Sequence, residues 1–258
     1  MRIAFAGNPN SGKTTIYNAL TGRSEKVGNW GGVTVGRKEY PIKSEFTKGT
    51  EAIAVDLPGA YSMSPFTPEE GITSEYVRNE HPDVIINIVD ATNLSRSLFF
   101  TTQLLELGVP VVVALNKADI NAKEGTTIDV AALEQKLGCP VVSTTAIENK
   151  GLAEVVEKAV SLAGTTQKAP YLQADIDLHD KNAVDKEDRK RYKFVNDIVS
   201  KIEKRKTKSA EVNKQDTADK ILLNPIAGIL IFAAVMWFVF WVSQGWLGPI
   251  IADWLVGY

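Results

Sequence analysis

The 258-residue sequence contains only one cysteine and two histidines. Cys139 has no second cysteine with which to form an internal disulfide, and His81 and His179 lie too far apart in sequence to build a zinc pattern with it. A surplus of positive charge is also missing, because 29 Lys and Arg stand against 31 Asp and Glu. No global basic field is therefore available to hold nucleic acid. We expect a reducing compartment, no structural transition metal, no nucleic-acid partner and a buried Cys139.

Charged residues are absent from positions 221–252. Within this stretch, residues 226–242 (IAGILIFAAVMWFVFWV) carry no polar side chain, and with their flanks they reach the roughly 20 residues that cross a bilayer as a helix. The alternative is a buried core helix, which usually keeps one polar face. Seven Lys and Arg occupy 201–220 and none follows the apolar run, so the N-terminal side should be cytoplasmic. We predict a transmembrane helix at 221–243 in a lipid bilayer.

The sequence opens with a short apolar segment followed by Gly7–Thr14 (GNPNSGKT). This matches the phosphate-binding pattern G-x-x-x-x-G-K-[ST], in which loop N–H groups and a helix N-terminus surround phosphate oxygens. Lys13 is expected to reach the β- and γ-phosphates, and the Thr14 hydroxyl to bind Mg²⁺. A plain glycine-rich turn is the alternative. The predicted nucleotide-binding residues of this segment are Asn8, Asn10, Ser11, Gly12, Lys13, Thr14 and Thr15.

Three later motifs distinguish between nucleotides. Asp56 and Gly59 form a D-x-x-G pattern, in which the Asp holds Mg²⁺ through water and the Gly amide meets the γ-phosphate. The run Asn116–Lys117–Ala118–Asp119 follows a buried strand, and its Asp carboxylate can accept both guanine N–H groups that adenine lacks. Thr145 and Ala146 follow another strand and place an amide for the guanine oxygen. In isolation, 116–119 could be a strand-end turn with a helix cap. In this order the motifs predict GTP and GDP as ligands.

These four elements are typical of P-loop GTPases, and further segments resemble the ferrous-iron transport protein B (FeoB) family. The resemblance covers most of the chain and implies an N-terminal GTPase, a helical spacer and a membrane domain that moves Fe²⁺ inward across a bacterial-type inner membrane, with residues 1–220 in the cytoplasm. The segments that carry it are 7–10 (GNPN), 27–35 (VGNWGGVTV), 56–62 (DLPGAYS), 89–94 (VDATNL), 104–108 (LLELG) and 221–223 (ILL).

The resemblance also implies several residue roles. Thr34 would be the switch threonine whose hydroxyl reaches Mg²⁺, while Asn10 and the carbonyls of Gly28 and Trp30 would hold K⁺; a loop-stabilising Asn10 is the alternative. The K⁺ would stand where an arginine finger otherwise supplies charge. Ala60 occupies the place of the glutamine that orients water in many relatives of Ras, so we expect slow hydrolysis. The predicted catalytic residues are Asn10, Lys13, Thr34 and Gly59, and the predicted Mg²⁺ ligands are Thr14, Thr34 and Asp56.

The base motif departs from the family at one position, because many members have Met where Lys117 stands. A lysine there is the general GTPase pattern, and it is expected to pack over the guanine ring. This departure does not change the predicted base preference.

Alternating apolar strands and helical stripes predict an α/β fold: a Ras-like, doubly wound and mostly parallel sheet, followed by a small helical domain and one transmembrane helix. Pro41 is expected on an edge strand. Tyr192, Val195 and Ile198 begin the apolar stripe of an amphipathic helix. The predicted strands lie near 2–7, 36–43, 51–56, 83–90, 110–116 and 140–143, and the predicted helices near 13–21, 72–80, 94–108, 128–138 and 151–163. The predicted domains are a GTP-binding domain at 1–165, a helical spacer resembling a GDP-dissociation inhibitor at 166–220, the transmembrane helix at 221–243 and the start of a membrane domain at 244–258.

Three functions fit these observations. The first is a GTPase that couples its nucleotide state to iron uptake by the remaining membrane domain of the same protein, with small accessory proteins or self-association as further partners. The second is a membrane-anchored GTP switch unrelated to iron, in which residues 166–220 are a solvated linker with a basic face near anionic lipids. The third is a ribosome- or tRNA-associated GTPase. The apolar run and the lack of a basic surface argue against the third.

Overall fold

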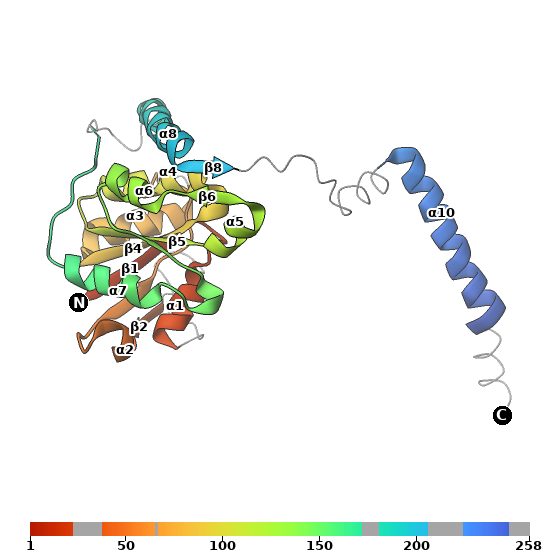
Figure 1. Cartoon of the computed structure of the whole chain (residues 1–258), viewed down its shortest axis with the longest axis horizontal. Helices are drawn as coiled ribbons and strands as arrows, with labels where there is room; N and C mark the ends of the chain where they lie inside the picture. Colours follow the sequence, from red (N-terminus) through yellow and green to blue (C-terminus); the bar gives the residue numbers. More distant parts are fainter. Residues whose placement is uncertain (23–37, 65–66, 172–180, 206–223, 248–258) are drawn as a thin grey trace. The chain divides into compact units, whose positions relative to one another are not determined.

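Six strands form one sheet in the order β2-β3-β1-β4-β5-β7 (Figure 1). The computed structural model describes residues 1–22, 38–64, 67–171, 181–205 and 224–247. Five strands are parallel, and β2 pairs antiparallel with β3 at one edge, where it contains Pro41 as predicted. β4 and β5 are buried along their whole length, as parallel strands covered on both faces usually are. The six strands are β1 (Arg2–Gly7), β2 (Lys38–Pro41), β3 (Ile53–Asp56), β4 (Val84–Asp90), β5 (Val111–Asn116) and β7 (Val141–Ser143).

Helices cover both faces of this sheet and bury two apolar clusters. On one face, Ile16 and Leu20 of α1 pack with Leu152 and Val155 of α7 against the sheet. On the other face, α3, α4 and α6 bury the second cluster (Figure 1). The predicted doubly wound, mostly parallel sheet is therefore confirmed. The helices of this unit are α1 (Lys13–Thr21), α2 (Ser44–Thr47), α3 (Pro68–Glu80), α4 (Leu94–Leu105), α5 (Ala118–Glu124), α6 (Val130–Leu137), α7 (Leu152–Leu162) and α8 (Lys181–Ile202), with short 3₁₀ turns at Ala91–Asn93 and Ala146–Glu148.

Several predicted boundaries differ from the structure; for example, the helix predicted at 94–108 ends at Leu105. Helix α3 begins at Pro68 rather than at 72, because Thr67 caps it: the Thr67 hydroxyl accepts a hydrogen bond from the Glu70 N–H at 3.3 Å. The segment predicted as a helix from 128 instead starts with strand β6 (Thr126–Ile128), which pairs antiparallel with β8 (Glu203–Arg205). Cys139 is buried at 3% exposure beside β7, as expected, and burial raises the pKa of its thiol to about 12.

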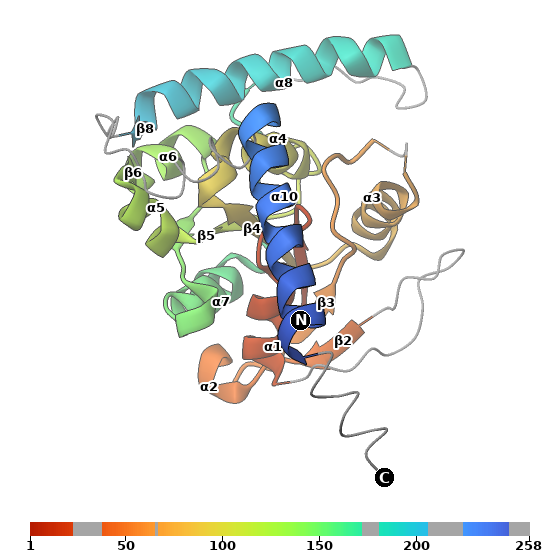
Figure 2. The same cartoon turned by 90° about the vertical axis from the view of Figure 1, so that its right-hand side faces the viewer.

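Helix α8 lies along α4 and α6, as Figure 2 shows. The predicted amphipathic stripe is present, because Val195 and Ile198 are buried in the core while the Tyr192 ring stacks on Phe99 of α4 at a centroid distance of 4.2 Å. One compact unit spans Met1–Lys206 and thus includes α8. The proposed domain boundary at 165 stays a prediction.

A buried ionic network joins α8 to the end of α4. The Arg191 guanidinium donates to both carboxylate oxygens of Glu106, at 2.8 and 2.7 Å, and each side chain is only 6% exposed. The Tyr171 hydroxyl lies 2.6 Å from Glu106 Oε1 and 3.0 Å from the Thr102 carbonyl oxygen. Burial and the Glu106 carboxylate raise the pKa of Tyr171, so its hydroxyl stays protonated as a donor.

Substituting Tyr171→Phe should lower the free energy of unfolding by about 2 kcal/mol, because a hydrogen bond to a carboxylate is lost without a change in ring volume. Urea denaturation followed by circular dichroism measures this loss. Tyr192→Phe is the matched control: its ring stacking is kept at a half-exposed position, so we expect a change within about 0.5 kcal/mol. Equal losses in the two variants would contradict the contribution of the Tyr171 hydroxyl.

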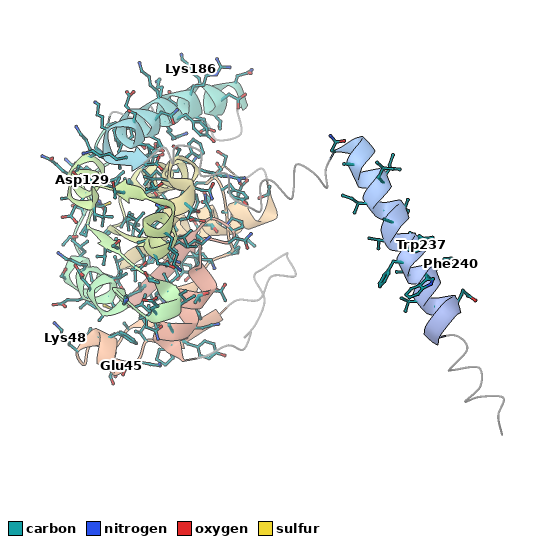
Figure 3. The ribbon with its side chains drawn as sticks, turned by 45° about the vertical axis from the view of Figure 1, so that its right-hand side comes forward. Glu45, Lys48, Asp129, Lys186, Trp237 and Phe240 are labelled. Atoms are coloured by element: carbon teal, nitrogen blue, oxygen red, sulfur yellow. The ribbon has the colours of Figure 1, made fainter. Side chains whose placement is uncertain are left out.

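The second unit lies within Thr207–Tyr258, and its described part is helix α10 (Pro225–Val242) followed by a π-helical turn at Ser243–Leu247. The Asn224 side chain caps α10 by accepting from the Ala227 N–H at 3.2 Å. Residues Ala227–Gly245 have a mean hydropathy of 1.9 and none is buried in the structure, so the helix is long and apolar enough to cross a membrane. Trp237 and Phe240 project outward from it (Figure 3). The first three positions of the predicted span, 221–223, and most of 244–258 lie outside the described residues.

Candidate nucleotide-binding site

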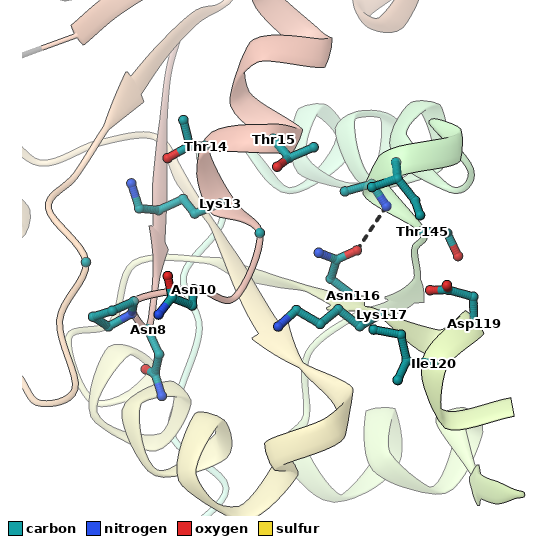
Figure 4. A pocket seen from close by; sticks show the side chains of 15 residues that line it. Asn8, Asn10, Lys13, Thr14, Thr15, Asn116, Lys117, Asp119, Ile120 and Thr145 are labelled. Atoms are coloured by element: carbon teal, nitrogen blue, oxygen red, sulfur yellow. Dashed lines mark hydrogen bonds between the residues drawn. The ribbon is translucent and has the colours of Figure 1, made fainter. Parts of the chain in front are cut away.

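A cavity of about 670 Å³ opens at the carboxyl ends of the parallel strands, where ligands of open α/β sheets bind. It brings Lys13, from the start of α1, together with Asp119, from the start of α5, although 106 positions separate them in sequence (Figure 4). Twelve of the predicted site residues line this one cavity. They are Asn8, Asn10, Gly12, Lys13, Thr14, Thr15, Gly59, Asn116, Lys117, Asp119, Thr145 and Ala146.

The remaining predicted residues fall into two groups. Ser11 and Asp56 are buried, at 1% and 8% exposure, and are not among the residues that line the cavity. Thr34, Gly28 and Trp30 lie outside the described residues. Among the residues that the structure describes, no three His, Cys, Asp or Glu side chains gather as a metal site. The Asp56 carboxylate pairs with Lys13, and Thr14, the next residue along α1, lines the cavity.

The loop between β1 and α1 is tightly packed at its glycine. Gly12 has φ +94°, and a Cβ atom there would lie 2.2 Å from Asn116 Nδ2, so the position needs glycine both for its conformation and for its space. The next residue, Lys13, is largely buried, and its ammonium pairs with the Asp56 carboxylate at the end of β3. The phosphate-loop lysine and the carboxylate of the D-x-x-G motif are thereby within direct reach of each other.

Asn116 connects the two ends of the cavity. Its Nδ2 donates to the Ser11 carbonyl oxygen at 2.9 Å. Its Oδ1 accepts from the Ala146 N–H at 3.0 Å, the bond that is dashed in Figure 4. The side chain is 3% exposed, so these bonds are formed away from bulk water. Asn116 thus holds the phosphate loop against the loop after β7, and the Ala146 N–H is already engaged with it.

Lys117 has a partner that the motifs did not predict. Its Nζ donates to Asp90 Oδ2 at 2.6 Å, and Asp90 also accepts from the Thr92 N–H and hydroxyl at the end of β4. Lys117 adopts a left-handed backbone conformation with φ +67°, which turns the chain from β5 into α5. The position of Asp90, a carboxylate at the carboxyl end of a fully buried strand, is the sequence signal that could have identified it.

Three further lining residues were not predicted: Pro9, Ile120 and Ile147. Ile120 and Ile147 are 38% and 78% exposed and flank Asp119 and Ala146, so apolar surface stands at the base end of the cavity. Their positions next to Asp119 and Ala146 in the sequence could have suggested that they line the site, but the indication is weak because isolated exposed isoleucines are common.

The segment after β3 carries Gly59 into the cavity. The Ala60 N–H donates to the Gly7 carbonyl oxygen at 3.3 Å, and a Cβ on Gly59 would lie 3.3 Å from Pro9. Ala60 is 2% exposed and is not among the residues that line the cavity, so its methyl group does not reach a ligand there.

Comparison with known sequences identifies the family. The model of the family described as ferrous iron transport protein B matches residues 1–159. The Fe(2+) transporter FeoB of Salmonella typhimurium is 47% identical over 156 residues, and that of Escherichia coli K12 is 45% identical over the same length. Each match covers 59% of this chain and 20% of the relative, so the chain spans about a fifth of these relatives' length.

Solved structures agree with this assignment. The cytosolic domain of L. pneumophila FeoB has a TM-score of 0.70 at 30% identity, and the alignment covers 80% of this chain and 100% of that one. A GDP-bound mutant of S. thermophilus NFeoB has a TM-score of 0.67 at 32% identity, with 79% and 100% covered. The fold is therefore a P-loop GTPase domain, and the chain belongs to the ferrous iron transport protein B family.

Proposed function

We propose that this chain binds GTP and GDP together with Mg²⁺ and hydrolyses GTP slowly. The observation that carries the proposal is the single cavity lined by both Lys13 and Asp119, one suited to phosphate oxygens and the other to the guanine edge. The relatives with solved structures include GDP-bound S. thermophilus NFeoB and the T. maritima FeoB cytosolic domain in a GMPPNP form. Titration with GTP, GDP and ATP tests it, and equal competition by ATP would overturn the base assignment.

At the phosphate end, Lys13 would exchange its Asp56 partner for the β- and γ-phosphate oxygens. Asp56, Thr14 and Thr34 would then hold Mg²⁺, which neutralises developing charge on the phosphates. The N-terminus of α1 adds its N–H groups and partial positive charge. Gly59, which already lies against the phosphate loop, would offer its amide to the γ-phosphate.

At the base end, the Asp119 carboxylate would accept the two N–H groups of guanine. The Ala146 N–H donates to Asn116, so a contact between this amide and the guanine oxygen has to be shared with Asn116. Ile120 and Ile147 provide apolar surface for the base, and Lys117 is held by Asp90 at the floor of this end.

Hydrolysis should be faster in K⁺ than in Na⁺ at equal ionic strength, by tenfold or more. Ala60 cannot orient water, so a cation bound through Asn10 and the carbonyls of Gly28 and Trp30 would supply the charge that an arginine finger supplies elsewhere, where it contributes about 10³–10⁵ in rate. Phosphate release from GTP measures the rates. Asn10→Ala should remove the difference between the two salts and leave GDP affinity within threefold. Equal wild-type rates in both salts would count against the cation.

The nucleotide state of this pocket is further proposed to control Fe²⁺ uptake by a membrane domain, with α10 as a membrane-spanning helix and residues 1–220 in the cytoplasm. Family membership and the apolar helix support this. The alternative is a membrane-anchored GTP switch without an iron function. Uptake of radioactive Fe²⁺ by cells producing the full-length protein separates them: Lys13→Ala should abolish uptake in the first case and leave it unchanged in the second.

A further inference from the structure

The loop that follows Gly59 is fastened to helix α4 by one buried side chain. Gln103, on α4, is 4% exposed, and its two amide atoms are both used. Its Oε1 accepts from the Met63 N–H at 2.8 Å, and its Nε2 donates to the Ser62 hydroxyl at 3.2 Å. An amide that donates and accepts to neighbouring loop residues fixes their position more tightly than an apolar contact of the same size.

The same helix also touches the phosphate loop. The Arg96 guanidinium lies 4.0 Å from the centre of the Tyr61 ring, and the Arg96 carbonyl oxygen accepts from Asn8 Nδ2 at 3.3 Å. Helix α4 therefore contacts both the residues after Gly59 and the residues after Gly7. Of the two α4 side chains in these contacts, Gln103 is the buried one, and it bonds to the main chain of the loop at the Met63 N–H.

Two further hydrogen bonds, each 3.3 Å long, hold the residues on either side of Gly59. The Thr73 hydroxyl donates to the Pro58 carbonyl oxygen. Ala60 contributes a methyl group and a main-chain bond to Gly7 at 3.3 Å. Gly59 rests so close to Pro9 that a shift of the following residues would move its amide relative to the phosphate loop. In the proposed function this amide meets the γ-phosphate of GTP and has no corresponding partner in GDP, so the position of the loop would affect the affinities for the two nucleotides differently.

We propose that Gln103 is a positioning residue that sets the Gly59 amide for a γ-phosphate and thereby determines the preference for GTP over GDP. This inference rests on the proposed nucleotide function. It assigns to α4, which does not line the cavity, the task of holding the triphosphate-sensing loop.

The test compares the affinities of wild type and Gln103→Leu, as the full chain in detergent micelles, for fluorescent analogues of GDP and of a non-hydrolysable GTP. The ratio of GTP-analogue to GDP affinity should fall about tenfold, which corresponds to about 1.4 kcal/mol, while GDP affinity stays within twofold. Ser62→Ala removes the weaker Gln103 bond together with the 3.1 Å bond from the Ser64 N–H, and it keeps the Met63 bond. It should lower the ratio by a factor of about three, which keeps the inference testable if Gln103→Leu does not fold.

Thr101→Val is the matched control, because it removes another buried hydrogen bond of α4, the 2.6 Å bond from Asn87 Nδ2 to the Thr101 hydroxyl, without touching the loop. It should destabilise the protein and leave the ratio unchanged. An unchanged or raised ratio in Gln103→Leu, or an equal change in Thr101→Val, would overturn the inference. Wild-type failure to bind either guanine nucleotide would instead reject the proposed function itself.

Discussion

Replacing Lys13 by alanine should weaken GTP binding by about a thousandfold and abolish measurable hydrolysis. Lys13 is 8% exposed at the N-terminus of α1, where its charge would act on phosphate oxygens with little screening. Two opposite unit charges 4 Å apart contribute about 4 kcal/mol at an effective dielectric constant of 20, and this energy corresponds to roughly three powers of ten in affinity. Isothermal titration with GTP measures the loss.

The variant also removes the partner of Asp56, so its folding must be followed separately by thermal unfolding. Lys48→Ala is a suitable control, because Lys48 is 71% exposed and pairs with Glu157 on the surface. It should leave GTP affinity unchanged. If Lys13→Ala folds and its GTP affinity stays within tenfold of wild type, the phosphate role of Lys13 is wrong.

Replacing Asp119 by alanine should collapse the discrimination between GTP and ATP. A site built to hydrogen-bond a polar group rejects an analogue that lacks it by about 10⁴–10⁵. Without the carboxylate, guanine loses the acceptor for its two N–H groups, while adenine no longer meets a half-buried carboxylate to which it cannot donate the same pair of hydrogen bonds. Competition binding should show GTP affinity falling by a hundredfold or more and the GTP-to-ATP preference shrinking to about tenfold.

Asp197→Ala on the exposed side of α8 provides the control, since it removes a carboxylate of the same size far from the cavity lining. Its base preference should match that of wild type. Retention of a large preference by Asp119→Ala would mean that another group reads the base, and Ala146 would then be the first alternative.

The strands and the phosphate-end motifs were predictable because each depends on a short stretch of sequence. The run 111–116 is uniformly apolar until Asn116, so its burial and the polar residue at its carboxyl end follow from the sequence itself. Helix α7 shows a regular apolar stripe and was predicted within one residue at each end. The joint position of Lys13 and Asp119 then follows from the parallel order of the strands.

The contacts between motifs could not be predicted in the same way. The Asn116 bonds, the pairing of Lys117 with Asp90 and the Gln103 contacts each join residues 27 to 105 positions apart, and no local pattern records such distances. Strand β8 was missed for a related reason: its sequence, Glu-Lys-Arg, has no strand propensity and forms a strand only against β6.

The two bonds of Asn116 set the spacing between the base end and the phosphate end before any ligand arrives. The phosphate end and the base end of the cavity therefore lie at a fixed separation. The phosphate and base parts of one nucleotide bind to these two ends together, as the two arms of a bivalent ligand do. Guanosine and inorganic triphosphate, offered as separate molecules, gain nothing from that spacing, whereas the joined molecule bears the entropy loss of immobilisation only once. Through the buried Asn116 amide, the pocket therefore selects its ligand by the distance between base and phosphates as well as by their chemistry.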